Sequence, residues 1–477
     1  MERYEWKMQT PIADFVKEYA NRCGSRFHMP GHKGQAFLGC EPYDITEVAG
    51  ADALYEAEGI IAESEKNATN LFDTARTLFS TEGSSQCIRA MLYLALGNWK
   101  QAKRAGSTPL TANADRTKSE NRPYVIAARN VHKAFLYAAA LLDFDVVWLY
   151  PKEMHSLCSC HISREQLETE LQQQERCHGA APAAVYVTSP DYLGGQLDIT
   201  SLAKVCHRYG TILAVDNAHG AYLHFLKKSQ HPIDLGADIC CDSAHKTLPV
   251  LTGGAYLQIS KSAPEYFAKN AKQAMALFGS TSPSYLIMTS LDLCNAYLAD
   301  GYRERLTEPA LQLDEVRKSL REMGWSVEQT DPLKLTIQAP KAMTGKGLAE
   351  KLRAEQIECE YADEEYLVLM VTPENTKEDF EKLVKVLGTA PEATQPGVVE
   401  GTQLQPVHCE QKLSIRDAIF AKQERVPADQ TAGRICGVPT VGCPPAIPIV
   451  VPGEEIDERA IEMFIYYGID MVEVLKK

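Results

Sequence analysis

A lysine near the middle of the chain has the neighbours that cofactor chemistry needs. In residues 238–249, which read DICCDSAHKTLP, the residues Ser243, His245 and Lys246 follow an apolar, strand-like run. A lysine at such a strand end can project into a cleft and hold an aldehyde cofactor as a Schiff base. The neighbouring hydroxyl and imidazole are then available to bind that cofactor's phosphate. The alternative is an ordinary strand end with a solvated lysine.

A second motif lies about thirty residues upstream of this lysine. Residues 211–215 form a continuous apolar run, and Asp216 and the sequence NAHG follow it. This pattern predicts a buried parallel strand with an acid at its carboxyl end, where open α/β sheets bind ligands. A carboxylate there can pair with the pyridine nitrogen of pyridoxal 5'-phosphate (PLP) and keep the ring protonated. The alternative for Asp216 is a helix N-cap.

The motifs of this chain resemble, in the same order, those of the ornithine/lysine/arginine decarboxylases, a family of fold type I PLP-dependent enzymes. They are HMPGHKG at residues 28–34, EGSS at 82–85, RNVHKA at 129–134, VTSPDYLGG at 187–195, DNAHG at 216–220, SAHK at 243–246 and STSPSY at 280–285. The C-terminal residues 433–454 are also similar. The resemblance covers nearly the whole chain. It implies an α/β fold of the aspartate aminotransferase type, with a mostly parallel sheet in a large domain and a small C-terminal α/β domain.

The resemblance also implies catalytic roles for individual residues. Lys246 matches the lysine that carries the cofactor, and Asp216 matches the partner of the pyridine nitrogen. His132, within RNVHKA, matches the residue that stacks on the face of the ring. The alternative for His132 is a surface histidine at the start of a helix. His219 matches a position near the cofactor.

Phosphate binding is expected to draw on two parts of the sequence. Ser84 and Ser85 precede a predicted helix that begins near Gln86, and the amides and hydroxyls at a helix N-terminus favour an anion. The alternative is plain N-capping, which is compatible with phosphate binding. Ser243 and His245 are expected to add further contacts.

The resemblance predicts that the active site is shared between subunits. The sequence STSP at residues 280–283 is similar to the segment that a neighbouring subunit contributes to the phosphate, so Thr281 and Ser282 are predicted cofactor-binding residues of a homodimer or a higher homo-oligomer. Residues 1–65 are predicted to form an N-terminal arm that packs against the partner subunit.

The composition limits the partners of the chain. The 477 residues carry a formal net charge of -14, which argues against nonspecific binding to nucleic acid or to an anionic membrane. The sequence contains no apolar run long enough to span a bilayer and no signal-peptide core. We therefore expect a cytoplasmic protein with no membrane partner, whose 14 cysteines are reduced.

One group of possible metal ligands lies between a predicted strand and a predicted helix that follows it. Its spacing fits no common zinc pattern, so we expect a loop and no metal there. The group consists of His155, Cys158, Cys160 and His161.

Strand and helix signals alternate between residues 77 and 299, with predicted strands at residues 124–128, 145–149 and 183–187. This pattern predicts a large PLP-binding domain at residues 66–300, with an exposed excursion at residues 107–122. A small α/β domain is predicted at residues 301–390. Residues 388–405 are rich in Pro, Gly and Thr and read as a linker. The C-terminal region, residues 406–477, is expected to pack near the active site.

The function that this resemblance implies is decarboxylation of a basic amino acid, a small-molecule substrate, to an amine and CO₂. Arginine, lysine and ornithine remain open, because the family's substrate-contacting segment differs here at residues 436–439 and at Ala446. Two other classes also remain open. One is another fold type I reaction, such as that of an aminotransferase or a lyase, and the other is a non-catalytic regulatory relative.

Overall fold

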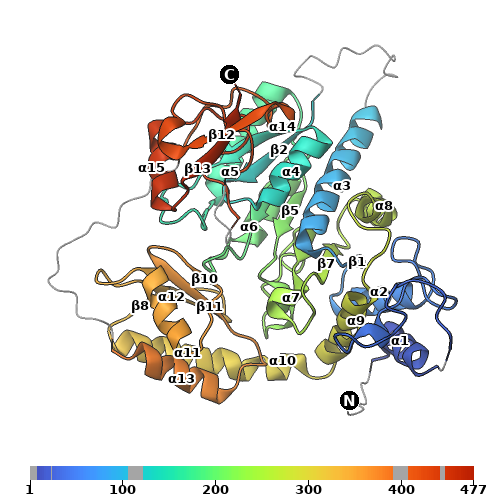
Figure 1. Ribbon diagram of the computed structural model, residues 1–477. Helices are drawn as coiled ribbons and strands as arrows, with labels where there is room; N and C mark the ends of the chain where they lie inside the picture. Colours follow the sequence, from blue (N-terminus) through green and yellow to red (C-terminus); the bar gives the residue numbers. More distant parts are fainter. Residues whose placement is uncertain (1–7, 23, 106–121, 390–406, 441–445, 477) are drawn as a thin grey trace. The chain divides into compact units, whose positions relative to one another are not determined.

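A computed structural model describes residues 8–22, 24–105, 122–389, 407–440 and 446–476 (Figure 1). The chain divides into two compact units built from interleaved stretches. The first unit comprises Met1–Asp115, Ala181–Val185 and Ile199–Arg305, and the second comprises Arg116–Ala180, Tyr186–Asp198 and Leu306–Lys477. The domain bounds expected from the sequence stay a prediction.

Seven strands form the main sheet, in the order β1-β7-β6-β5-β4-β2-β3. Their bounds are β1 Arg76–Ser80, β2 Tyr124–Ala128, β3 Asp145–Leu149, β4 Ala184–Thr188, β5 Leu213–Asp216, β6 Ile239–Asp242 and β7 Ala255–Ile259. The pairs β2–β3 and β5–β6 are parallel, whereas β7 is antiparallel to both β1 and β6. This arrangement confirms the predicted α/β fold with a mostly parallel sheet.

The central strands are buried along their whole length, as strands covered on both faces must be. Every residue of β2, β5, β6 and β7 is buried. Their continuous apolar runs explain this, since a strand with one solvated face would alternate apolar and polar residues. The predicted strands at residues 124–128 and 145–149 have the observed bounds of β2 and β3. The predicted strand at residues 183–187 lies one residue later, as β4.

Helices of the first unit cover its strands. They are α1 Pro11–Asn21, α2 Ile60–Leu71, α3 Gly83–Ala105, α6 Ile199–Arg208, α7 Ala244–Thr247, α8 Glu265–Ala276, α9 Tyr285–Ala299 and α10 Tyr302–Arg305, with the 3-10 helices η1 Glu41–Tyr43 and η3 Ala221–Phe225. The long helix α3 packs against β1, β6, β7 and α8. Helix α3 therefore lies beside β6, the strand that leads to Lys246.

Helix α1 is capped by a residue that is distant in the sequence. Its N-cap residue, Thr10, makes no side-chain capping hydrogen bond. Instead, Oδ2 of Asp292 in α9 accepts from the amides of Ile12 and Ala13 at 3.0 and 2.9 Å. The other oxygen, Oδ1, accepts from the hydroxyl of Ser64 in α2 at 2.5 Å. One buried carboxylate thus joins three helices.

In the second unit a four-stranded antiparallel sheet has the order β10-β11-β9-β8. Its strands are β8 Ser326–Val327, β9 Lys334–Gln338, β10 Tyr361–Ala362 and β11 Tyr366–Met370. The helices α11 Thr307–Glu322, α12 Gly345–Ala354 and α13 Lys377–Leu387 lie on one side of it (Figure 1). Apolar side chains from the sheet and these helices form one buried core. This is the predicted small α/β domain.

The C-terminal segment packs on elements of the same unit. It contains α14 Ile415–Phe420, the antiparallel strands β12 Gln423–Pro427 and β13 Met471–Leu475, the 3-10 helix η4 Ala428–Gln430, and α15 Glu458–Tyr466. The guanidinium of Arg129 donates to the carbonyls of Pro448 and Ile449 at 2.9 and 2.8 Å. The amide of Lys133, the first residue of α4 (Lys133–Leu142), donates to the carbonyl of Ala446 at 3.1 Å.

The unit also contains α5 Arg164–His178, which begins after the N-cap Ser163, whose side chain accepts from the amide of Gln166. Among the helices that the structure describes, none is long and apolar enough to cross a membrane. The predicted excursion at residues 107–122 and the predicted linker at residues 388–405 lie almost wholly outside the described residues.

Candidate active site

Asp216 stands at the carboxyl end of β5, where its side chain is almost fully buried. It is 3% exposed and lies opposite Cys241 of β6 in the parallel pairing. Its Oδ1 accepts from the amide of Ala218 at 3.2 Å and from the Cys241 thiol at 3.5 Å. Burial raises the pKa of Cys241 well above its ordinary value, so the thiol keeps the proton that it donates. The carboxylate therefore has a fixed place at the edge of the sheet.

Lys246 lies in α7, a one-turn helix that begins two residues after β6 ends. Its Nζ lies 2.9 Å from Nε2 of His219, which is 4% exposed and belongs to the segment after Asp216. The two motifs that the sequence singled out thus meet through their side chains. The structure places a lysine amine and an imidazole in contact, and a buried carboxylate ends the strand that leads to that imidazole.

Hydroxyl groups from two other motifs also meet. The Ser243 hydroxyl donates to the Ser84 hydroxyl at 2.8 Å. Helix α3 begins at Gly83, three residues before the predicted start near Gln86, so Ser84 and Ser85 lie in its first turn. The amides of a first helical turn have no partner within the helix, and an anion can accept from them. Ser84, Ser85 and Ser243 form a set of donors suited to a phosphate.

His245 points to a neighbouring turn. Its Nδ1 lies 3.0 Å from the carbonyl of Gly254, to which it donates, just before β7. This bond fixes the ring against the turn, and the predicted contact of His245 with a phosphate stays a prediction.

His132 is the N-cap residue of α4, and its Nδ1 accepts from the amide of Ala134 at 3.1 Å. This bond orients the ring at the start of the helix, a place that is compatible with both expectations for this residue. His132 belongs to the second unit, whereas Asp216 and Lys246 belong to the first. Stacking of His132 on a cofactor ring therefore stays a prediction.

Thr281 and Ser282 lie on an exposed segment before α9. The amide of Ser280 donates to Oε1 of Glu82 at 2.7 Å, and the amide of Ser282 donates to the Ser280 hydroxyl at 3.1 Å. The backbone of this segment is thus tied to the residue that precedes Gly83. The side chains of Thr281 and Ser282 are exposed, and their contact with a second subunit stays a prediction.

The structure also brings together buried polar residues that the sequence reading passed over. Asp242, the last residue of β6, contacts Asn217, His231 and Gln258. One signal in the sequence could have indicated this group. Asp242 ends a buried strand directly before Ser243, and a charge removed from water needs hydrogen-bond partners.

Comparisons with known proteins place the chain. The model of the Orn/Lys/Arg decarboxylase major domain matches residues 114–338, and that of the Orn/Lys/Arg decarboxylase C-terminal domain matches residues 401–473. The chain belongs to the Orn/Lys/Arg decarboxylase family. The family predicted from the motifs is thereby confirmed.

Similar sequences span nearly the same length as this chain. It is 28% identical over 484 residues to the uncharacterized protein YaaO of Bacillus subtilis, covering 95% of this chain and 93% of that protein. It is 26% identical over 492 residues to an arginine decarboxylase of the same organism, covering 97% and 94%. An arginine decarboxylase of Halalkalibacterium halodurans is 27% identical over 479 residues, covering 94% and 91%.

Solved structures show the same fold. The lysine decarboxylase of Francisella novicida superposes with a TM-score of 0.77 at 18% identity, covering 98% of this chain and 82% of that one. The constitutive lysine decarboxylase of E. coli gives 0.76 at 16% identity, with the same coverage. A serine palmitoyltransferase of Sphingomonas wittichii gives 0.53 at 14% identity, covering 80% and 82%. The fold is that of the fold type I PLP-dependent enzymes, as predicted.

The residues in the first unit fit the cofactor that this family generally uses. PLP has a phosphate, a ring nitrogen and an aldehyde. The unit offers two contacting serine hydroxyls beside a helix N-terminus, a buried carboxylate at a strand end and a lysine amine in contact with an imidazole. Each of these three groups therefore has a protein group of the required chemical type.

Proposed function

We propose that this protein is a PLP-dependent decarboxylase that converts a basic amino acid to the corresponding amine and CO₂. The observation that carries the proposal is the convergence within one unit of Lys246, His219 and Asp216 with the Ser84–Ser243 hydroxyl pair. The family membership supports the proposal, because two of the similar proteins named above are arginine decarboxylases. When bound, PLP supplies an electron sink for the electron pair left at the α-carbon after the carboxylate departs.

Each of the convergent residues has a distinct task in this proposal. The Lys246 amine holds the cofactor covalently. The Asp216 carboxylate pairs with the ring nitrogen and keeps it protonated, because a nearby negative charge favours the charged form of a base. The hydroxyls of Ser84, Ser85 and Ser243, with the amides of the first turn of α3, bind the phosphate.

The three histidines have supporting tasks. Nε2 of His219, at 2.9 Å from the Lys246 amine, is placed to accept a proton from it, which keeps the amine nucleophilic when the cofactor is loaded. His132 covers one face of the ring. His245 adds a contact to the phosphate from its place beside Gly254.

A homodimer completes the proposed site. Thr281 and Ser282 are exposed, and they reach the phosphate of the partner subunit. Large apolar side chains of the predicted N-terminal arm are also exposed, with Phe27 at 93%, Phe37 at 80% and Leu38 at 89%. Grouped exposed apolar residues of this kind mark an interaction surface, which supports an arm packed on a partner.

The substrate is an arginine, lysine or ornithine molecule, and the product is an amine of the kind used in polyamine synthesis. The arginine decarboxylases among the relatives favour arginine. An aminotransferase or lyase reaction on the same scaffold is the alternative, because such enzymes also use a lysine and an aspartate.

Release of CO₂ from a panel of amino acids tests the proposal. The purified protein is loaded with PLP and incubated separately with arginine, lysine, ornithine, glutamate and leucine. We expect release from a basic amino acid and none from glutamate or leucine, and no release by the Lys246→Ala variant. A keto acid formed without CO₂ would indicate an aminotransferase. PLP binding without any product would indicate a regulatory relative.

A further inference from the structure

A fully buried carboxylate adjoins the proposed site, and none of the roles above uses it. Asp242 is the last residue of β6 and directly precedes Ser243, and its side chain is 0% exposed. Removing a carboxylate from water is costly unless protein groups replace the lost hydrogen bonds. The hydrogen-bond partners of Asp242 therefore indicate which segments of the chain this residue holds together.

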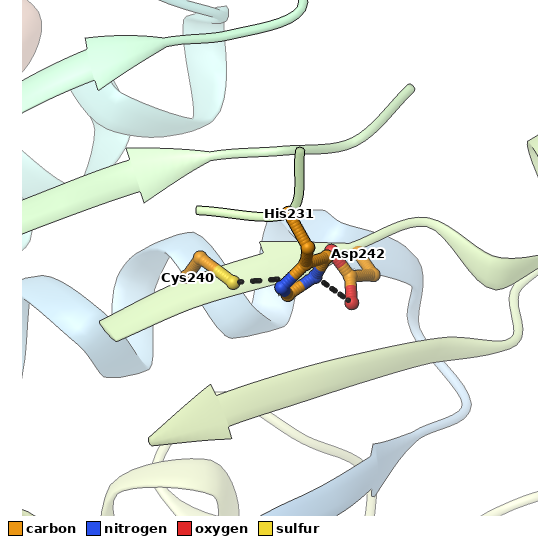
Figure 2. Close-up of side chains that lie close together, drawn as sticks. All are labelled: His231, Cys240 and Asp242. Carbon is orange, nitrogen blue, oxygen red and sulfur yellow. Dashed lines mark hydrogen bonds and ion pairs between the residues drawn. The ribbon is translucent and has the colours of Figure 1, made fainter. Parts of the chain in front are cut away.

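Three buried side chains surround this carboxylate. Asn217 Nδ2 donates to Oδ1 at 2.6 Å, and Gln258 Nε2 donates to Oδ2 at 2.9 Å. Nε2 of His231 lies 3.1 Å from Oδ2 and 3.2 Å from Oδ1 (Figure 2). The Thr77 hydroxyl donates to Gln258 Oε1 at 2.5 Å and so turns the Gln258 amide nitrogen toward Asp242.

The same cluster has the residue types of a metal site, since Cys240 lies beside His231 (Figure 2). The ligand atoms of His231, Cys240 and Asp242 lie within 4.8 Å of one another. However, both oxygens of Asp242 already accept from amides, and His231 Nε2 is placed as a further donor to them. Burial raises the pKa of Cys240 well above its ordinary value, so its sulfur keeps a proton. The geometry is that of a hydrogen-bond network.

The network joins the segments that carry the proposed site. Asn217 directly follows Asp216 at the end of β5, and Asp242 directly precedes the turn that contains Ser243 and Lys246. The Asn217 side chain also packs closely on the backbone, because a Cβ at Gly220 would lie 2.1 Å from Asn217 Oδ1. A glycine is therefore required at the end of the DNAHG motif.

We propose that Asp242 is a positioning residue which, through Asn217, holds the Asp216 segment against the Ser243–Lys246 turn. Backbone pairing aligns the strands, since the Asn217 amide donates to the carbonyl of Cys241 at 3.0 Å. Beyond that bond the two segments leave the sheet, and the Asp242–Asn217 bond ties them together. We call the hydrogen bond between Asp242 and Asn217 the tie. The consequence of the tie for cofactor binding rests on the proposed function, whereas the tie itself does not.

Two variants break the tie in different ways. Asp242→Asn keeps the shape of the side chain but places an NH₂ group against a donor. Asn217→Ala removes only the link to the Asp216 segment and leaves Asp242 with its other partners. Asp292→Asn is the matched control. Asp292 is also a buried carboxylate of the first unit that accepts three hydrogen bonds, and its partners lie in α1 and α2.

The first measurement is amide hydrogen exchange on the full chain without cofactor. We expect Asp242→Asn and Asn217→Ala each to speed exchange in residues 216–223 and 243–248 by roughly fivefold or more, because the tie no longer restrains local opening. Asp292→Asn should instead speed exchange in α1 and α2. Unchanged exchange of residues 216–223 and 243–248 in both tie variants would overturn the proposal. If Asp242→Asn does not fold, Asn217→Ala decides the matter.

The second measurement is the dissociation constant of PLP together with the absorbance spectrum of the bound cofactor. We expect the dissociation constant to rise about tenfold or more in both tie variants, with a shifted absorbance band, and to change less than about twofold in Asp292→Asn. Equal weakening in the control would show that general destabilisation is the cause, which overturns the positioning role. If the two variants show the expected faster exchange but the wild-type chain takes up no PLP, the proposed function is refuted and the Asp242–Asn217 link is still supported.

Discussion

Lys246 has its amine in contact with the imidazole of His219. The contact with His219 lies in a mostly buried region, and a short helix rather than an extended strand presents the lysine. A strand would have alternated the side chains of His245 and Lys246 between the two faces of the sheet. The one-turn helix lets His245 contact Gly254 while Lys246 reaches His219.

The first residue-level prediction is that Lys246→Ala loses turnover by on the order of 10⁴-fold, because no other group replaces the covalent attachment. Borohydride reduction of the PLP-loaded wild type should fix the cofactor on Lys246, as read by peptide mass mapping. The control is Lys269→Ala, which removes an exposed lysine of the same unit and should keep full activity. A reduced adduct on another lysine would contradict the assignment.

The second residue-level prediction concerns Asp216→Ala. Without the carboxylate the pKa of the ring nitrogen falls and the electron sink weakens, so kcat should drop by on the order of 10²–10⁴. Steady-state kinetics at saturating PLP measure this loss. Asp238 provides the matched control. It is a buried aspartate directly before the amino end of β6, whereas Asp216 lies at the carboxyl end of β5, and it accepts from the Leu213 amide at 2.8 Å. Asp238→Ala should lower stability but leave kcat of the folded protein within about threefold. Near-normal kcat in Asp216→Ala would remove Asp216 from the mechanism.

At the level of elements, the carboxylate of Asp292, which accepts hydrogen bonds from α1, makes the free energy of unfolding depend on pH. Burial raises the pKa of Asp292 to about 6, against hydrogen bonds from Ser64, Ala13 and Ile12 that lower it. The folded state thus holds the proton more tightly than the unfolded state. The contribution of this group is full below the unfolded pKa and is lost as the pH rises through about 6.

Asp292→Asn, which cannot ionise, should remove this pH dependence. We expect the stability of the wild type relative to the variant to fall by about 1 kcal/mol between pH 5 and pH 7. Thermal unfolding midpoints of both proteins at the two pH values measure the change. A difference between the two proteins that stays constant, or that grows with pH, would contradict the raised pKa.

Elements were predictable where local sequence determines them. The strands predicted at residues 124–128 and 145–149 have the observed bounds of β2 and β3, and a capping box between Thr376 and Asp379 fixes the start of helix α13 locally. Helix α3 begins earlier than expected, because Gly83, Ser84 and Ser85 are weak helix formers whose helical turn is fixed by tertiary contacts such as the Ser84–Ser243 bond. The cap of α1 was unpredictable, since Asp292 lies 280 residues from Ile12.

The candidate site follows the same rule. Motif order indicated Asp216, Lys246 and the serines, because each motif is short and continuous in the sequence. The Asp242 network was missed because its members come from β6, β7 and two loops. A hydrogen bond between Asn217 and Asp242, 25 residues apart, leaves no periodic pattern in the sequence.

At the scale of the whole molecule, the proposed sharing of the active site between two subunits predicts complementation between inactive variants. Lys246→Ala and a double substitution of Thr281 and Ser282 by bulky residues should each be inactive alone. In a mixed dimer, one of the two sites has an intact Lys246 and an intact donated segment. Random pairing makes half of the dimers mixed, so up to about a quarter of wild-type activity should return after reassembly.

The readout is CO₂ release after the two variants are mixed, unfolded and refolded together, with mixed dimers verified by mass. Absence of activity in verified mixed dimers would show that the segment serves its own subunit, to which the Ser280–Glu82 bond already ties it. The decarboxylase assignment does not depend on that outcome.

The contact between Arg129 and the C-terminal segment bears on how the chain is made in the cell. Arg129 donates to a carbonyl 320 residues further along the chain. At a synthesis rate of roughly 5–20 residues per second, the ribosome needs roughly 15 to 60 s to deliver that carbonyl after Arg129. During this interval the apolar strands β2 and β3 have left the ribosome while the segment that completes their unit does not yet exist. Exposed apolar surface of an incomplete unit favours aggregation, so we expect chains truncated before residue 448 to aggregate more readily than the complete chain.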